Sequence, residues 1–500
     1  MEKDLAIFFD KIDEKVRETG FQVSVTEEGK VLSVGDGIAH VGGLGDAKLY
    51  ELIEFQGGDR GIVFDLASDS IGTVLLTELN GIRAGDSAFK TDKIASVKVG
   101  DQLLGKVLDA LGATLEKEFE LEQPVMYTVE REAPTLLQRD FVNEPLHTGI
   151  KVIDSMLPIG RGQRELIIGD PSIGKTSIAI DTIINQKHSD VISIYAAIGQ
   201  NKSHILKVID EIRTYGDLSK TIFVVADASN SLGLQFIAPY SATAIAEYFL
   251  DRGKDVLIVY DDLTKHAEAY RSLSLLLKRP PGREAYPGDI FYIHSRLLER
   301  SAKLGEAYGG GSLTALPIVE TQQGRISSYI PTNLISITDG QIYLDMLLFN
   351  KGIRPAVDVG KSVSRIGGKA QVDIMKDVAE RLKIDYSRFT DVEVFTKFGA
   401  HVEEETAKLI RRGERLREIL KQPRFYPFSL DEEVLSFIIL ESGRLDEVDL
   451  SLVEGACREI LSKIREAFPQ VVDRIRGEGR IGEGDSTALR DFVASLEIGV

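Results

Sequence analysis

The pattern of apolar and polar positions changes several times along the chain, and each change predicts a different kind of structure. Near the start, Leu5, Phe8, Ile12 and Val16 recur at helical spacing between charged residues. This spacing predicts a short amphipathic helix within residues 1–22. The pattern fits equally well a helix that packs on its own domain and a docking arm for a partner.

Residues 23–91 have a different pattern, in which short β-rich runs alternate with glycine-rich turns about every ten residues. Such spacing is typical of a small antiparallel barrel or sandwich. The predicted strands are Lys30–Val34, Leu52–Phe55, Gly61–Leu66 and Ile71–Leu76.

Residues 92–370 alternate apolar strands with longer helical stretches. This alternation predicts a multi-domain α/β protein whose central domain is a mostly parallel sheet covered by helices. The clearest examples are Glu165–Ile168 before Lys175–Ile184, Val191–Ala197 before Ile205–Tyr215, and Val256–Tyr260 before a long helix.

Strand signals fade after about residue 371, and residues 371–500 read as a C-terminal α-helical bundle. Ser429 and Glu432 have the spacing of a capping box, which predicts a helix that begins there and continues through Leu440. Amphipathic helices follow to the end of the chain.

Composition narrows the class of protein without indicating its chemistry. The 500 residues contain 60 Lys+Arg and 78 Asp+Glu, a net charge of -18, which disfavours a main role in coating nucleic acid or anionic lipid. Cys457 is the single cysteine, so neither an internal disulfide nor a cysteine-built metal cluster is expected. No apolar run has the length of a spanning helix, and the first residues lack the features of a secretory signal. We therefore expect no direct membrane insertion.

The strongest chemical signal is the segment Gly169-Asp170-Pro171-Ser172-Ile173-Gly174-Lys175-Thr176, which fits G-x-x-x-x-G-K-[ST]. It lies between a buried strand and a helix, where backbone N–H groups converge on phosphate oxygens. Lys175 is expected to reach the β- and γ-phosphates, and the Thr176 hydroxyl to ligate Mg²⁺. Ser177 follows as part of the same loop. The segment therefore predicts a nucleotide site that takes ATP and Mg²⁺.

A P-loop needs a second carboxylate near the metal, at the end of a neighbouring strand. The apolar run Val256–Tyr260 ends in Asp261 and Asp262. Asp261 is the candidate for the metal-linked carboxylate, and Asp262 is the candidate cap of the next helix.

Hydrolysis also needs a group that orients or deprotonates water, and the strand ending near Ala197 is followed by Gln200. An amide does not accept a proton at neutral pH, although it can position water as some GTPase glutamines do. The sequence thus predicts a site that holds nucleotide and is poorly suited to hydrolyse it.

Longer blocks of the chain resemble the α-subunit family of F-type ATP synthases. The resemblance runs from about Val23 to the C-terminus, with the N-terminal helix in the expected place. The blocks that carry it are Pro158–Asp170, Arg279–Asp289, Tyr329–Asn333 and Ile337–Ile342.

The resemblance implies a β-barrel, a P-loop domain and a helical domain, in a ring of three copies alternating with three β subunits. It also implies contacts with the central-stalk γ subunit and, through the N-terminal helix, the peripheral-stalk δ subunit. Nucleic acid is not an expected partner. The implied location is peripheral, on the cytoplasmic side of the bacterial inner membrane.

The same resemblance implies roles for two further parts of the chain. Gly360–Gly367 matches the segment that supplies an arginine to the adjacent β subunit's nucleotide, which makes Arg365 the expected finger and Ser362 a nearby residue needed for activity. Phe349, Arg354 and Gln422 match residues lining the non-catalytic base pocket.

Two departures from the family pattern affect this nucleotide site. Pro171-Ser172-Ile173 replaces the usual Arg-Gln-Thr, and Pro171 lacks a backbone donor. Arg424 stands where a glutamine is usual beside the base pocket, so affinity and base preference at this site do not follow from the family.

Two other functions compete with this interpretation. An autonomous ring ATPase of the same superfamily, such as a secretion ATPase, predicts an acid where Gln200 stands. An RNA-translocating hexamer such as a termination helicase predicts stacking aromatics and basic residues near the N-terminus, whereas residues 1–90 have mixed charge. Both are less favoured than the ATP synthase subunit.

Overall fold

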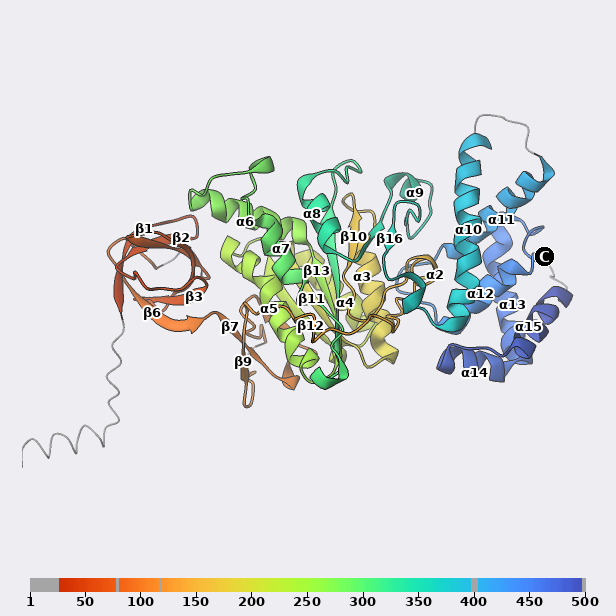
Figure 1. The fold of residues 1–500 in the computed structure, drawn as a ribbon, viewed down its shortest axis with the longest axis horizontal. Helices are drawn as coiled ribbons and strands as arrows, with labels where there is room; N and C mark the ends of the chain where they lie inside the picture. Colours follow the sequence, from red (N-terminus) through yellow and green to blue (C-terminus); the bar gives the residue numbers. More distant parts are fainter. Residues whose placement is uncertain (1–26, 78–80, 117–118, 397–402, 497–500) are drawn as a thin grey trace, which may run out of the picture. The chain divides into compact units, whose positions relative to one another are not determined.

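The computed structural model describes residues 27–77, 81–116, 119–396 and 403–496 (Figure 1). The chain divides into two compact units, one ending at Ile94 and the other beginning at Ala95. The predicted N-terminal helix of residues 1–22 lies outside the described residues.

The first unit is a closed antiparallel barrel with strand order β1-β2-β5-β4-β3-β6. It contains every strand predicted in this region, together with two that the prediction missed, β2 and β6. The strands are β1 (Glu28–Gly35), β2 (Ile38–Gly42), β3 (Glu51–Phe55), β4 (Arg60–Leu66), β5 (Ser70–Leu75) and β6 (Ser87–Ile94).

The barrel closes because β1 pairs with both β2 and β6, which leaves no unpaired edge between them. Inward-facing side chains such as Val41, Ile53, Phe55 and Leu75 are buried and fill the interior. A barrel of this size is therefore a packed core, as expected when short strands alternate between buried and exposed positions.

The second unit is built on an eight-stranded sheet with the order β16-β15-β10-β14-β13-β11-β12-β8. All neighbouring pairs are parallel except β15 and β16. Its strands are β8 (Val107–Asp109), β10 (Glu165–Gly169), β11 (Ile192–Gln200), β12 (Thr221–Asp227), β13 (Asp255–Asp261), β14 (Ser312–Glu320), β15 (Gly340–Tyr343) and β16 (Val363–Ser364). A separate ribbon pairs β7 (Ser96–Val99) with β9 (Val125–Thr128).

Helices cover this sheet, with α5, α6 and α7 to one side and α3 and α4 to the other (Figure 1). The long α5 is apolar on nearly all sides and is buried along most of its length, because it packs on β11, β12 and β13. The helices of this region are α2 (Lys151–Met156), α3 (Lys175–Asn185), α4 (Lys202–Tyr215), α5 (Leu232–Leu250), α6 (Leu263–Leu276), α7 (Ile290–Leu298), α8 (Tyr329–Ile337) and α9 (Met346–Asn350).

The C-terminal part is helical, as predicted, and its apolar core is continuous with that of the sheet domain. The helix predicted from the capping box is present, and the Ser429 and Glu432 side chains form both hydrogen bonds of that motif. The helices are α10 (Asp373–Thr396), α11 (Glu404–Leu420), α12 (Leu430–Glu441), α13 (Val453–Ala467), α14 (Pro469–Glu478) and α15 (Glu483–Ser495). Across the described ranges, no helix is both long enough and apolar enough to cross a bilayer.

Candidate functional site

The P-loop joins the end of β10 to the first turn of α3, as the sequence predicts. Gly174 has a φ of 103°, a left-handed conformation that glycine adopts without strain, and it turns the chain into α3. At Gly169 a Cβ would press against Ile173 and the Leu344 carbonyl. The two fixed glycines are therefore required by backbone conformation and by close packing, and together they aim the N-terminus of α3 at the loop's centre.

Lys175 is held in the loop by groups of the protein itself. Its side chain is 5% exposed, and its Nζ donates to the Asp170 carbonyl at 2.7 Å and lies 3.4 Å from Glu320 Oε1. The Asp170 carboxylate in turn accepts from the Thr321 hydroxyl and from Gly324 N. These contacts hold the Lys175 ammonium group within the P-loop.

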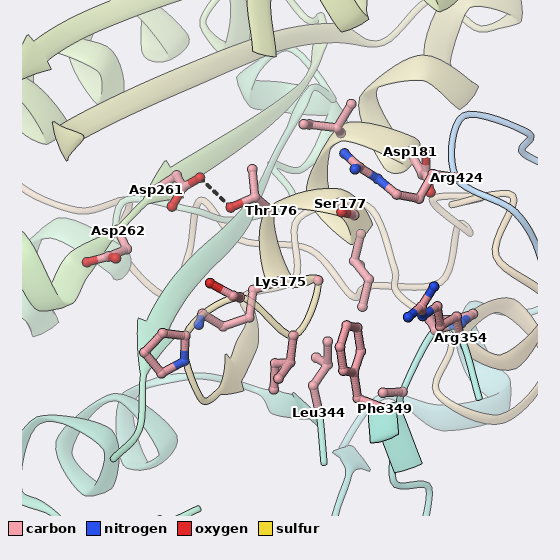
Figure 2. A pocket seen from close by; sticks show the side chains of 18 of the residues that line it. Lys175, Thr176, Ser177, Asp181, Asp261, Asp262, Leu344, Phe349, Arg354 and Arg424 are labelled. Atoms are coloured by element: carbon pink, nitrogen blue, oxygen red, sulfur yellow. Dashed lines mark hydrogen bonds between the residues drawn. The ribbon is translucent and has the colours of Figure 1, made fainter. Parts of the chain in front are cut away.

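Asp261, the last residue of β13, lies beside the predicted metal ligand Thr176. Thr176 Oγ1 donates to Asp261 Oδ2 at 2.8 Å (Figure 2), and Tyr195 also donates its hydroxyl to this oxygen. Burial and the neighbouring Asp261 charge raise the pKa of Tyr195 well above its usual range. Because parallel strands end at the same edge of the sheet, β10 and β13 bring the loop hydroxyl and the carboxylate together.

Asp262 serves as a helix cap, the role that the sequence suggested for it. Its side chain accepts from Lys265 N at 2.8 Å and begins α6. Burial, together with the Asp261 charge, raises the pKa of Asp262 to about 8. Asp261 and Asp262 are thus adjacent carboxyl groups with different partners.

Gln200 lies at the end of β11 and binds the same carboxylate as Thr176. Its Nε2 donates to Asp261 Oδ1 at 3.1 Å. A glutamate at this position would instead face Asp261 with a like charge, whereas the amide is a favourable partner. The end of β11 therefore presents an amide, held by hydrogen bonding, to Asp261.

A cavity of about 670 Å³ extends from the P-loop to the predicted base pocket. Figure 2 shows Asp261 and Asp262 on one side of the view and Phe349 and Arg354 on the other, with the P-loop between them. All predicted nucleotide-binding residues from Pro171 to Ser177 line this cavity, as do Gln200, Phe349, Arg354, Gln422 and Arg424. Gly169 and Asp170 do not line it.

The base end of the cavity differs in detail from the sequence-based expectation. Arg354 lies 4.8 Å from the centre of the Phe349 ring. Gln422, expected to hydrogen-bond the base, has its amide oxygen on Lys151 N at 3.1 Å and its amide nitrogen on the Gly149 carbonyl at 3.0 Å. The Gln422 amide is therefore already hydrogen-bonded to the α2 segment.

Arg424 forms a second polar group at the base end. Its Nη2 lies 3.4 Å from Glu211 Oε1, and its guanidinium lies over the Phe425 ring, which stacks on Tyr215. Asp181 accepts from Phe425 N, and burial raises the pKa of Asp181 to about 6. The glutamine-to-arginine departure thus introduces a paired cation at this end of the cavity.

Arg365, the predicted finger, and the nearby Ser362 lie outside this cavity, since neither residue lines it. Arg365 follows the edge strand β16 directly, and its side chain is exposed. Ser362 is buried; its hydroxyl donates to the Asp358 carbonyl at 2.6 Å and accepts from Tyr343 N at 2.9 Å. These contacts give Ser362 a place in holding the turn before Arg365.

Several residues at this site were missed by sequence reasoning. Glu320 ends β14, next to β10, so the convergence of parallel strand ends would have found it. His204, Lys207 and Glu211 line the cavity from α4, and Asp181 lines it from α3. Nothing local in the sequence indicates which face of these two helices meets the cavity.

Three models of one family match the chain in succession. They are described as the ATP synthase alpha/beta family, beta-barrel domain (residues 24–91), the ATP synthase alpha/beta family, nucleotide-binding domain (149–364), and the ATP synthase alpha/beta chain, C terminal domain (371–496).

Similar curated proteins carry the name ATP synthase subunit alpha. The protein of Caldanaerobacter subterraneus subsp. tengcongensis is 50% identical over 463 residues, which cover 93% of this chain and 92% of the relative. That of Dehalococcoides mccartyi is 48% identical, covering 98% and 97%, and ATP synthase subunit alpha 1 of Chlorobium luteolum is 49% identical, covering 96% and 94%.

Proposed function

The chain belongs to the ATP synthase alpha/beta family, and from this premise we propose that it is the regulatory, non-catalytic nucleotide-binding subunit of a rotary F-type ATP synthase. Such a complex makes ATP from ADP and phosphate at the expense of a transmembrane ion gradient. Membership in the complex follows from relatives about half identical over nearly the whole chain. That this chain is the regulatory, non-catalytic subunit of the complex is our proposal.

We propose that the ligand of the cavity is ATP with Mg²⁺. The donors fit this metal, because a hydroxyl and a carboxylate oxygen, 2.8 Å apart in Thr176 and Asp261, are the hard ligands that Mg²⁺ prefers. Thr176 would bind Mg²⁺ directly and Asp261 would bind it through water. Mg²⁺ would neutralise phosphate charge there; Lys175 and the α3 N-terminus would bind and orient the phosphates.

The single observation that carries the non-catalytic role is the Gln200 amide bound to Asp261. The P-loop, Lys175, Thr176 and Asp261 are in place around it, so the proposed lack of turnover is assigned to this amide. An amide has no proton-accepting capacity at neutral pH, and its hydrogen bond to Asp261 directs its N–H toward that carboxylate. Bound ATP is therefore expected to stay intact and to stabilise the folded subunit.

The second part of the proposal concerns Arg365. Its exposure at a sheet edge, outside the chain's own cavity, suits a residue that serves a neighbouring subunit. A guanidinium offers fixed charge and forked donors to phosphoryl oxygens that gain charge in the transition state. We infer that Arg365 reaches the nucleotide of an adjacent β subunit, and that Ser362 holds the turn that presents it.

We further propose that three copies alternate with three β subunits around a γ subunit. The N-terminal segment, which lies outside the described residues, would bind the δ subunit. We propose a peripheral position on the cytoplasmic side of a bacterial inner membrane.

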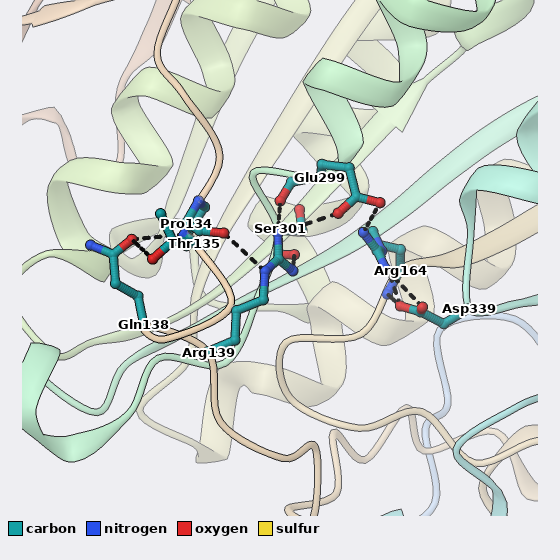
Figure 3. Close-up of polar contacts among 8 residues, drawn as sticks. All are labelled: Pro134, Thr135, Gln138, Arg139, Arg164, Glu299, Ser301 and Asp339. Carbon is teal, nitrogen blue, oxygen red and sulfur yellow. Dashed lines mark hydrogen bonds and ion pairs between the residues drawn. The ribbon is translucent and has the colours of Figure 1, made fainter.

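One loop of the second unit supports the ring assembly, because it presents large apolar side chains to solvent. Leu136, Leu137 and Phe141 are 86%, 85% and 85% exposed. The loop is nevertheless fixed in place: Arg139 donates to the carbonyls of Pro134 and Glu299, as Figure 3 shows. A rigid exposed apolar patch marks a protein interface, and we assign it to the adjacent subunit of the ring.

Replacing Leu136, Leu137 and Phe141 together by serine is therefore expected to weaken assembly. The loop's own anchors are untouched, so the isolated chain should keep its melting temperature within about 2 °C, whereas recovery of the complex on size exclusion should fall at least about tenfold. The matched control is a triple serine variant at Leu32, Leu49 and Leu66, which are exposed on the barrel. Equal recovery for wild type and loop variant would remove the loop from the interface.

The proposed function as a whole is tested by co-expression with the cognate β subunit. The isolated chain should have negligible steady-state ATPase activity, and a co-purified complex of ring size should turn over ATP. Substantial turnover by the pure isolated chain would favour the autonomous ATPase instead.

A further inference from the structure

A buried carboxyl group lies close to Arg365 and takes no part in the nucleotide site. Glu165, the first residue of β10, is 0% exposed. Its Oε2 accepts from Gln163 Nε2 at 2.7 Å, and its Oε1 has no hydrogen-bond partner among the described residues. A buried acceptor left unsatisfied is costly, so this oxygen calls for a donor.

The strand register aligns Glu165 with the Arg365 segment. Glu165 pairs with Gly340 on β15, and Gly340 pairs with Ser364 on β16. The three residues thus lie in line across three strands spaced about 4.8 Å apart, and Arg365 follows at once.

Gly340 leaves room for the carboxylate to approach β16. A Cβ at this position would collide with Glu165 Oε2 and with the Val363 carbonyl. The Glu165 carboxylate therefore occupies the space above Gly340, between its own strand and the strand that leads to Arg365. Glycine is required at position 340 because a side chain would clash with these neighbours, and not because the backbone has an unusual φ.

The backbone of Arg365 is fixed at the same place. Arg365 N donates to the Asp339 carbonyl at 3.0 Å, and the Asp339 carboxylate binds Arg164 through N, Nε and Nη2. Arg164 also pairs with Glu299 at 2.7 Å (Figure 3). The main chain at Arg365 is thus anchored to Asp339, which Arg164 holds in turn.

The Arg365 guanidinium itself forms no hydrogen bond or ion pair with any residue that the structure describes, so its direction is not determined by contacts within the chain. Burial raises the pKa of Glu165 well above its usual range, as does the Asp339 charge, while the Arg365 charge lowers it.

We propose that Glu165 is a positioning residue for Arg365, whose guanidinium uses one N–H group on the free Glu165 oxygen and turns the others toward the neighbouring subunit's nucleotide. The inference rests on the proposed finger role of Arg365. An exposed arginine loses much of its rotamer freedom when it is fixed. A partner that orients it beforehand reduces that cost in the transition state.

The test is Glu165→Gln in the complex assembled with the β subunit. Turnover (kcat) is expected to fall about tenfold with KM for MgATP changed less than twofold, because the arginine acts in the transition state. Affinity for MgADP-fluoroaluminate should fall in parallel, while affinity for MgADP alone is retained. In the Arg365→Ala background, the same change should alter the residual turnover less than twofold.

Glu433→Gln is the matched control, because Glu433 on α12 is 1% exposed and neither of its carboxylate oxygens has a hydrogen-bond partner within the described part of the chain. It should leave turnover unchanged. If the Glu165→Gln complex fails to assemble, Glu165→Asp replaces it in the same comparison with and without Arg365→Ala. The shorter side chain draws the carboxylate back, and turnover is expected to fall about fivefold.

Equal losses in both backgrounds would assign Glu165 a purely structural role and overturn the inference. Normal turnover of Glu165→Gln beside a severely impaired Arg365→Ala would also overturn it, while leaving the proposed function intact. Full activity of Arg365→Ala would instead refute the finger itself.

Discussion

Replacing Arg365 with alanine is expected to lower the turnover of the assembled complex by about 10³-fold or more, the range in which arginine fingers act. The reason is electrostatic, because fixed charge at the phosphoryl oxygens is most effective in the transition state, away from water. ATP binding in this chain's own cavity should be unaffected, since Arg365 does not line it. The measurement is kcat of purified complex under saturating MgATP.

Two further variants of the complex make this result specific. Arg365→Lys keeps the charge but loses the forked donors, so it should recover only part of the activity. Lys369→Ala removes another exposed cation four residues away and should leave turnover unchanged. If Arg365→Ala turned over ATP within about threefold of wild type, the chain would not supply the finger.

Glu247→Gln is expected to destabilise the second unit by roughly 3–5 kcal/mol, the cost of leaving a buried charge without its partner. Arg300 is 1% exposed, and its Nε and Nη2 donate to the two oxygens of Glu247 at 2.7 Å each. Its Nη1 donates to the Val129 carbonyl, which ties α5 and the segment after α7 to the segment that follows β9. Urea unfolding followed by circular dichroism measures the loss.

The control for this stability effect is Glu454→Gln, which breaks the exposed i,i+4 pair with Arg458 and should change stability by less than about 0.5 kcal/mol. A double change of Glu247 and Arg300 to leucine and methionine should recover much of the lost stability, because no unpaired charge is left. Equal urea midpoints for wild type and Glu247→Gln would show that the buried pair contributes little.

The features that the sequence predicted well are those determined by neighbouring residues. An apolar strand, a glycine-rich turn and a helix start follow one another over a dozen residues, so the P-loop could be located from the sequence alone. The position of Asp261 could be predicted in the same way. It ends an apolar strand, and parallel strands end at the same edge of the sheet, so its carboxylate is expected near the P-loop. The capping box at Ser429 is equally local.

Features that depend on distant contacts could not be predicted. The hydrogen-bond partners of Gln422, Lys151 N and Gly149 O, lie about 270 positions earlier in the chain. Strand β16 has only two residues and no strand signal of its own; its pairing with β15 creates it. Glu165 begins an apolar strand as a charged residue, whereas its position on β10, between β14 and β15, leaves it completely buried.

The proposed non-catalytic nature of this nucleotide site is tested most directly by following ATP bound to the isolated chain. Purified protein is incubated with MgATP, freed of unbound nucleotide by rapid filtration, quenched in acid and analysed for ATP and ADP over time. If Gln200 leaves the site without a catalytic base, as its hydrogen bond to Asp261 indicates, near-stoichiometric nucleotide should remain bound as ATP for hours. Conversion to ADP within seconds, with release of phosphate over repeated turnovers, would show that the site hydrolyses ATP and would contradict the proposed non-catalytic role.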